Sequence, residues 1–121
     1  MKDQVRFVEK FIETFFVFSI LWTIGGFLTE ESMYKFDLFL TEAIKMELPR
    51  GNMYDSYVDT DKVCGEYIKW ERIVPGFEYR KDIPYHDLVV PTVNTVRYST
   101  LLRYCLAMRK PVFITGFTGV G

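Results

Sequence analysis

The glycines near the carboxyl end of the sequence are the residues whose types and spacing suggest chemistry. Gly116 and Gly121 form a Gly-x-x-x-x-Gly pattern directly after the apolar run 112–115. Glycines let backbone N–H groups approach phosphate oxygens without a Cβ in the way, and the hydroxyl of Thr118 can add a donor. The pattern predicts a phosphate-binding loop that includes Gly119 as well; a plain strand-to-helix turn is the alternative.

A complete P-loop continues with Lys and then Ser or Thr, which hold the β- and γ-phosphates and the Mg²⁺ ion. The sequence given ends at Gly121 and contains neither residue in that position. Phosphoryl transfer needs the lysine charge, the metal ion and a positioned water. We therefore assign no catalytic residue and no metal site, and we expect the chain on its own not to hydrolyse ATP measurably.

A second candidate for nucleotide contact is the apolar segment Val89, Val90 and Pro91. It precedes the helix that leads to the glycine loop, so it is placed to form a wall beside an adenine ring and to offer backbone groups to the base. The alternative is a core strand that the proline ends.

The other residue types that carry chemistry give no site. His86 is the only histidine and has no nucleophile in an obvious relation to it, so we expect a surface residue. Cys64 and Cys105 lack metal-ligand spacing, which indicates two reduced thiols. Trp22 and Trp70 are expected as core anchors. The formal net charge is −1 and basic residues do not cluster, so nucleic-acid binding has little support.

Two helices are predicted in residues 1–48, which form a small helical subdomain. In residues 4–24 apolar side chains recur at helical spacing, and beyond Phe15 polar residues almost vanish, so we expect this half to be enclosed. Gly25 and Gly26 end or kink the helix. A cap at 29–32 opens the second helix, whose apolar stripe is Met33, Phe36, Phe39 or Leu40, and Ile44.

The apolar run from Phe15 to Leu28 also raises the question of a membrane. It holds 14 residues, short of the ~20 that a spanning helix needs. No basic region or small-residue cleavage site marks it as a secretory signal. We expect a helix buried among other helices and no membrane partner; a small membrane-anchored protein remains an alternative.

The pattern changes after the break at Pro49–Asn52. Residues 53–59 and 68–74 predict two short antiparallel strands joined by a polar loop, and residues 77–87 an irregular connector. Leu88–Val90 predict a short strand or extended entry.

Thr92 or Asn94 can cap a helix that runs to about Met108. Arg109 and Lys110 sit at its end, where the helix dipole favours cations. Residues 112–115 then predict the strand that leads into the glycine loop.

A series of motifs follows in a recognisable order along nearly the whole chain. They are FSILWTIGG at 18–26, Lys35-Phe36-Asp37, Pro49, Tyr54-Asp55, Val58-Asp59, Trp70, Val74-Pro75, VVPTVNTVRYSTLL at 89–102 and KPVFITGFTGVG at 110–121. The series resembles the dynein heavy chain at the junction of the second and third AAA+ modules of its motor ring. Tyr98, Tyr54-Asp55 and Trp70 resemble the axonemal members.

The resemblance implies an α+β fold. Residues 1–80 would be a helical AAA+ lid with a short β-hairpin extension, and residues 88–121 the first strand, helix and strand of a P-loop α/β domain. The third module of the family binds ATP or ADP with Mg²⁺ and regulates the motor. Gly116, Thr118, Gly119 and Gly121 would belong to its phosphate loop.

The resemblance also implies partners and a location for the parent chain. The partners would be neighbouring AAA+ modules of the same heavy chain, microtubules, and dynein intermediate and light chains. The location would be the cytoplasm and cytoskeleton, in the axoneme of a cilium or flagellum. Asn94 departs from the family's usual Asp, a mild change at a capping position. Another AAA+ ATPase and a helical interaction module without a nucleotide role remain alternatives.

Overall fold

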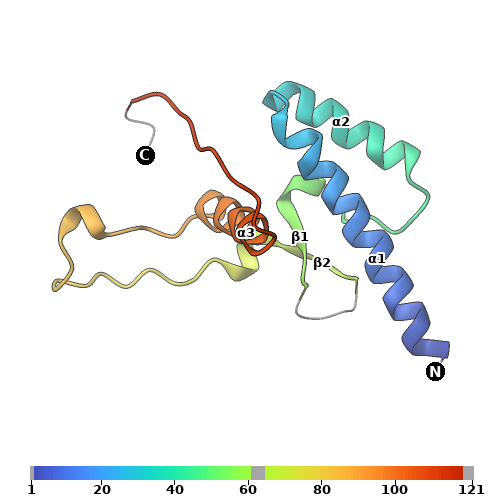
Figure 1. Cartoon of the computed structure of the whole chain (residues 1–121), viewed down its shortest axis with the longest axis horizontal. Helices are drawn as coiled ribbons and strands as arrows, with labels where there is room; N and C mark the ends of the chain where they lie inside the picture. The colour runs from blue at the N-terminus through green and yellow to red at the C-terminus, as the bar shows by residue number, and fades with distance from the viewer. Residues whose placement is uncertain (1, 61–64, 119–121) are drawn as a thin grey trace. The chain divides into compact units, whose positions relative to one another are not determined.

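The computed structural model describes residues 2–60 and 65–118, which form two compact units, one up to Arg72 and one from Ile73 onward (Figure 1). The first unit holds the helices α1 (Lys2–Thr23) and α2 (Glu30–Ala43) and the strands β1 (Ser56–Val58) and β2 (Tyr67–Lys69). The second holds the helix α3 (Val93–Ala107).

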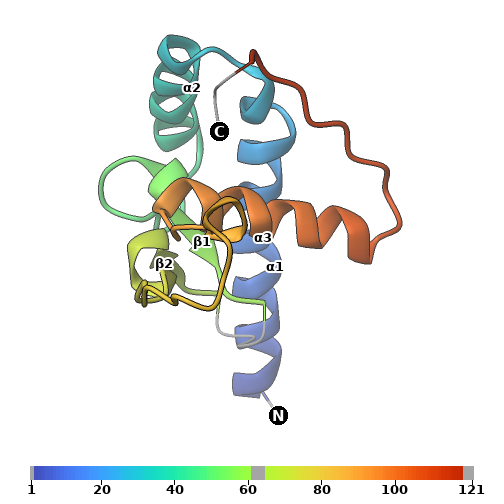
Figure 2. The ribbon, with the colours of Figure 1, turned by 90° about the vertical axis from the view of Figure 1, so that its left-hand side faces the viewer.

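The two helices of the first unit are joined by a short 3₁₀ turn at Gly25–Phe27, from which they diverge (Figure 1, Figure 2). Helix α1 buries Val17, Phe18 and Leu21, and α2 buries Leu40 against the same cluster. Helix α2 begins after Thr29 with two acidic residues in its first turn, where the helix dipole favours them. Both predicted helices are confirmed, although α2 ends at Ala43 and leaves Ile44 in extended backbone.

The expectation that the apolar end of α1 is enclosed on every side is wrong. Phe16 and Ile24 are exposed, and Phe27 is 89% exposed in the 3₁₀ turn. One face of α1 packs into the core of the first unit, and the opposite face is left open by the described part of the chain. No helix among residues 2–60 and 65–118 is both long and apolar enough to cross a membrane.

The predicted hairpin is present as two antiparallel strands, but they are shorter than predicted, because Met53–Asp55 and Trp70–Ile73 form 3₁₀ turns. Ser56 pairs with Lys69, Tyr57 with Ile68 and Val58 with Tyr67. All three residues of β1 are buried, because the strand lies beneath other elements of the first unit. Most of the predicted connecting loop, residues 61–64, lies outside the described residues.

Aromatic side chains tie the hairpin to the helical core. Trp70 is fully buried, its ring stacks on Tyr57 at 4.8 Å, and its Nε1 donates to the Tyr54 carbonyl oxygen at 3.0 Å. Tyr54 in turn meets Trp22 edge to face, with ring centroids 5.3 Å apart. Both tryptophans therefore anchor the core, as their sequence context predicts, although Trp22 is only partly buried.

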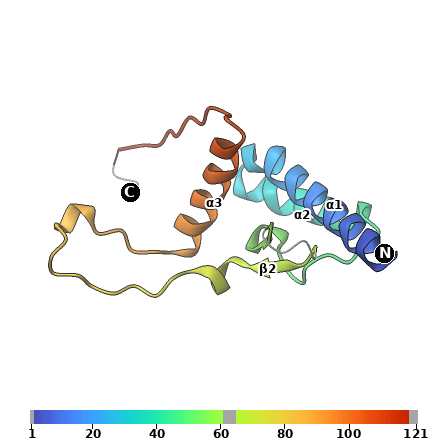
Figure 3. The ribbon, with the colours of Figure 1, turned by 60° about the horizontal axis from the view of Figure 1, so that its bottom comes forward.

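In the second unit the backbone on either side of α3 is extended and carries one short 3₁₀ turn, Tyr85–Asp87 (Figure 3). Residues 77–87 are thus the irregular connector that the sequence predicts. The predicted strand at 112–115 is not formed, and residues 88–90 take the extended entry that was the alternative to a strand. A strand needs a neighbour for its backbone N–H and C=O groups, and the described residues of this unit offer none.

Candidate nucleotide-binding segment

The start of α3 is fixed by a reciprocal pair of threonines. Thr92 Oγ1 accepts from the backbone N–H of Thr95 at 3.2 Å, and Thr95 Oγ1 accepts from the backbone N–H of Thr92 at 2.7 Å. This capping box satisfies N–H groups that the first helical turn leaves unpaired. Of the two predicted caps, Thr92 is the one used. Val89, Val90 and Pro91 immediately precede this cap. The capping box therefore also fixes the direction in which their backbone leads into the helix.

Val89 and Pro91 form one wall of a groove whose volume is about 450 Å³. The opposite wall is a face of α3, which contributes Val96, the hydroxyls of Thr95, Ser99 and Thr100, and Arg103. Val90 does not line the groove and is exposed. Ligand pockets commonly combine apolar lining with a few polar groups, and this groove has both.

The glycine loop lies apart from that groove. Gly116 and Thr118 are exposed and do not line it. Gly119 and Gly121 lie outside the described residues. Residues 112–118 form no sheet ladder, so nothing holds the backbone N–H groups in the convergent geometry that a phosphate requires. In the described structure Val89 and Pro91, two of the three residues predicted to contact the adenine, line one groove. The described residues of the predicted phosphate loop, Gly116 and Thr118, do not line that groove.

Three other reactive or ionisable groups of the second unit, His86, the Arg80–Asp82 pair and Cys105, are exposed. His86 is exposed, as predicted for a surface residue. Arg80 donates to the Asp82 carboxylate at 2.7 Å, and this hydrogen bond holds the pKa of Asp82 below its usual value. Cys105 is a free, exposed thiol, and Cys64 lies outside the described residues. Neither the ion pair nor the thiol lines the groove.

Sequence reasoning did not identify the polar ridge of α3 that faces Val89 and Pro91. Thr95, Ser99 and Arg103 occur at i, i+4 and i+8, so a helix places them on one face. That spacing is visible in the sequence, but hydroxyl residues at helical spacing are common on exposed surfaces. The signal becomes specific only when the extended segment before the helix is seen to lie along the same face.

Comparison with known families agrees with this order of elements. Residues 1–72 match the model of the dynein heavy chain AAA lid domain, and residues 77–121 match the P-loop containing dynein motor region. The fold and the sequence therefore define an AAA lid followed by the start of a P-loop motor domain. The chain belongs to the dynein heavy chain family.

Similar proteins span several organisms. The chain is 40% identical over 111 residues to human dynein axonemal heavy chain 6, covering 88% of this chain. It is 32% identical over 132 residues to dynein heavy chain-like protein 1 of Plasmodium falciparum, covering 94%, and 31% identical to mouse dynein axonemal heavy chain 2, covering 91%. The chain spans about 3% of the length of these relatives.

The family matches and the structure divide the chain at similar places. The lid match ends at residue 72, which is also the last residue of the first compact unit, and the P-loop match begins at residue 77. The boundaries expected from the resemblance, 80 and 88, lie within the second unit. Residues 80–88, between the two expected boundaries, belong largely to the exposed connector 77–87. Few tertiary contacts mark a domain boundary in that stretch.

Proposed function

We propose that this chain is the segment of an axonemal-type dynein heavy chain that joins the second and third AAA+ modules of the motor ring. The observation that carries this proposal is the order of the two family matches, a lid directly followed by a P-loop motor region. The parent would be an ATP-driven microtubule motor in the axoneme of a cilium or flagellum. Its partners would be the neighbouring modules, microtubules, and intermediate and light chains.

In this proposal the second unit supplies part of a regulatory nucleotide site. Val89, Val90 and Pro91 would contact the adenine, and the groove along α3 supports that role for Val89 and Pro91. Gly116, Thr118, Gly119 and Gly121 would hold the phosphates of ATP or ADP, with Mg²⁺ bound in the complete heavy chain. The connector between the two units would transmit the nucleotide state of one module to the lid of the module before it.

A segment swap tests the proposal. The aligned segment of human dynein axonemal heavy chain 6 is replaced by this chain, and microtubule gliding driven by the purified motor is measured. We expect gliding to be retained. We expect Gly119→Leu to slow it at least fivefold, because a side chain there displaces phosphate from the loop.

Gly76→Leu is the matched control for that swap. A Cβ on Gly76 would meet no atom within 4 Å, so this change should leave gliding within about twofold of the swapped motor. A swapped motor that folds but does not move, or equal effects of the two glycine variants, would refute the proposal.

The isolated chain offers a second test. We expect no ATP turnover above buffer, because the sequence has no lysine, Mg²⁺ ligand or water-positioning residue in the required places. Turnover that is lost on changing Gly119 to a bulky residue would contradict this expectation.

A non-enzymatic interaction module is the second candidate function. The observation that favours it is the exposed apolar face of α1, formed by Val5, Val8, Ile12 and Phe16. A fluorescent ATP analogue distinguishes the two functions in a chain extended beyond the phosphate loop, because the interaction module does not bind it.

A further inference from the structure

The first unit contains a hollow of about 430 Å³ between α1, the loop that follows α2, and the hairpin. Three cationic side chains line it: Lys10 from α1, Arg50 from the loop and Lys69 from β2. Two carboxylates, Glu47 and Glu66, also line it, so its formal charge is +1 although the whole chain carries −1. We call this feature the basic hollow.

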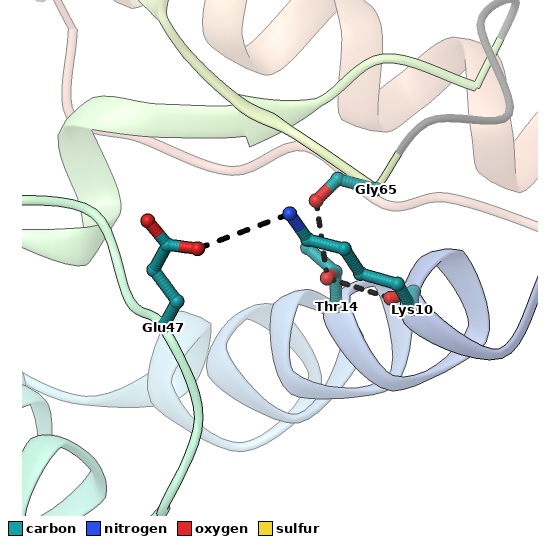
Figure 4. Close-up of polar contacts among 4 residues, drawn as sticks. All are labelled: Lys10, Thr14, Glu47 and Gly65. Atoms are coloured by element: carbon teal, nitrogen blue, oxygen red, sulfur yellow. Dashed lines mark hydrogen bonds and ion pairs between the residues drawn. The ribbon is translucent and has the colours of Figure 1, made fainter. Parts of the chain in front are cut away.

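The cations of the basic hollow are poorly neutralised. Lys10 Nζ lies 3.9 Å from the Glu47 carboxylate (Figure 4), and the Glu47 side chain is 89% exposed. Such a long, solvated pair neutralises the lysine charge only weakly. Within residues 2–60 and 65–118, Arg50 and Lys69 make no ion pair.

Lys69 lies close to the turn that carries Arg50. Its Nζ is 3.9 Å from the position that a Cβ on Gly51, the residue after Arg50, would occupy. Arg50 and Lys69 therefore contribute two positive charges to the lining of one hollow, and a carboxylate bound there would be attracted by both.

The remaining lining suits a peptide side chain. Ser56, which is 1% exposed, also contributes to the lining. Leu48, Pro49 and Tyr67 supply apolar surface for the methylene groups of a Glu side chain. Arginine and lysine together bind carboxylates by charge-assisted hydrogen bonds.

We propose that the basic hollow is a docking site for an acidic peptide segment of a partner protein, whose carboxylate lies between Arg50 and Lys69. The size and charge of the hollow favour this ligand over nucleic acid, because nucleic-acid binding neutralises several phosphates along an extended basic surface. The site lies in the first unit, so the proposal does not depend on nucleotide binding by the second.

Binding of fluorescein-labelled hexaglutamate to the full 121-residue chain tests the proposal, with labelled hexaglutamine as the uncharged probe. We expect hexaglutamate to bind at least tenfold more tightly than hexaglutamine. Arg50→Glu and Lys69→Glu should each weaken hexaglutamate binding at least tenfold, because each replaces an attractive contact with a repulsive one.

Lys45→Glu is the matched control, since it makes the same charge change in the same unit at an exposed residue that does not line the hollow. It should alter the affinity less than twofold. Equal weakening by Lys45→Glu would show binding to the overall charge of the chain and would overturn the proposal. The proposal would also be overturned if hexaglutamate bound no more tightly than hexaglutamine. Full displacement of hexaglutamate by an equimolar amount of inorganic phosphate would overturn it too, because it would show a site for small anions. Arg50 lies in an exposed loop, so Arg50→Glu stays informative if Lys69→Glu disturbs the hairpin.

Discussion

At the scale of single residues, Tyr54 links the helices of the first unit to the hairpin. Its ring is buried against Trp22, and its hydroxyl lies against Gly25 and has no hydrogen-bond partner among the described residues. The preceding residue is held by Asp37, whose Oδ1 accepts from the Met53 N–H at 3.0 Å. Burial, and then the charge of Asp37, raise the pKa of Tyr54 to about 12.

We expect Tyr54→Phe to raise the free energy of unfolding by about 0.5–1 kcal/mol at pH 7, since it removes a buried hydroxyl that makes no hydrogen bond. Urea denaturation followed by tryptophan fluorescence measures this change. Tyr67→Phe is the control, because the Tyr67 hydroxyl donates to the Thr14 carbonyl oxygen at 3.4 Å and its loss should not stabilise the chain. A destabilised Tyr54→Phe chain would mean that the hydroxyl has a partner.

The same tyrosine predicts a loss of stability at alkaline pH. The pKa of Tyr54 is about 12 in the folded chain and 10.0 when unperturbed. The contribution of this tyrosine to the free energy of unfolding is therefore fully present below pH 10 and is lost as the pH rises toward 12. Denaturation at pH 9 and pH 11.5 should show a smaller loss for Tyr54→Phe than for the unchanged chain. An equal loss in both would assign the effect to other groups.

Gly25 explains why the turn between α1 and α2 accepts no side chain. A Cβ there would collide with the Tyr54 hydroxyl and lie 3.0 Å from the Phe36 ring. We expect Gly25→Ala to lower the free energy of unfolding by about 2–3 kcal/mol. Gly26→Ala, whose Cβ would lie 3.7 Å from Trp22, is the matched control and should cost less than about 1 kcal/mol, both values read from urea denaturation.

At the scale of elements, the hairpin is fixed to α1 by a close backbone approach. Gly65 has a φ of +63°, and a Cβ there would lie 2.9 Å from the Phe11 backbone nitrogen. Thr14 Oγ1 donates to the Gly65 carbonyl oxygen at 3.2 Å and lies 2.7 Å from the Lys10 carbonyl oxygen (Figure 4). Helix and hairpin therefore touch through backbone atoms, which cannot move aside as a flexible side chain can.

Comparing Gly65→Ala with Gly51→Ala separates contact from backbone strain. Both glycines have positive φ, at +63° and +84°, but a Cβ on Gly51 would meet only Lys69 Nζ, at 3.9 Å. We expect a loss of about 1 kcal/mol for Gly51→Ala from strain alone and at least about 2 kcal/mol for Gly65→Ala, measured by urea denaturation. Similar losses would show that the hairpin does not pack on α1 as described.

The end of α3 offers an opposite, stabilising change. Arg109 has a φ of +53°, and the N–H groups of Arg109 and Lys110 donate to the carbonyl oxygens of Leu106 and Cys105, both at 2.9 Å. This is the Schellman arrangement, in which glycine is preferred at the position of Arg109. Arg109→Gly should stabilise α3 by about 1 kcal/mol, because glycine adopts a positive φ without strain. The change should appear as a higher helix content in circular dichroism. Lys110→Gly is the control and should not raise it.

At the scale of the whole molecule, the chain is two units that adjoin at Arg72 and Ile73, and the exposed connector 77–87 lies within the second. The first unit has a core that combines both helices with Met53 and Tyr54, and Tyr54 links this core to Trp70 next to the hairpin. The second has one helix, and its extended segments leave Phe113, Ile114 and Phe117 exposed. Exposed apolar side chains in extended backbone are typical of strands that bury them against a sheet.

We expect limited trypsin digestion to cut first after Arg80 or Lys81, which lie in the connector outside any helix or strand. Mass spectrometry should detect an amino-terminal fragment that resists further cleavage and a carboxyl-terminal fragment that is degraded faster. Replacing both residues with Gln should delay the first cut. First cleavage after Arg6 or Lys10 of α1 instead would contradict the two-unit description.

Much of the local structure follows from the sequence. Apolar spacing predicts α1 and α2, Thr92 predicts the start of α3, and the alternation around Trp70 predicts the hairpin, because these signals come from neighbours a few residues apart. Gly116 to Gly121, together with the motifs before them, suffices to indicate the dynein family. The same signals mislead at 112–115, where β-forming residues need partner strands that no local pattern supplies; at 88–90 they leave a strand and an extended segment equally open, and the structure has the extended segment.

The sequence by itself determined where the helices lie, that α3 is capped at Thr92 or Asn94, and which family the chain belongs to, because capping and helical periodicity act over one or two turns. Only the tertiary structure decided which face of α1 is buried, why Gly25 and Gly65 accept no side chain, and that Lys10, Arg50 and Lys69 share one hollow. Those features depend on contacts between residues far apart in the chain, and such contacts are set by packing after the local elements have formed.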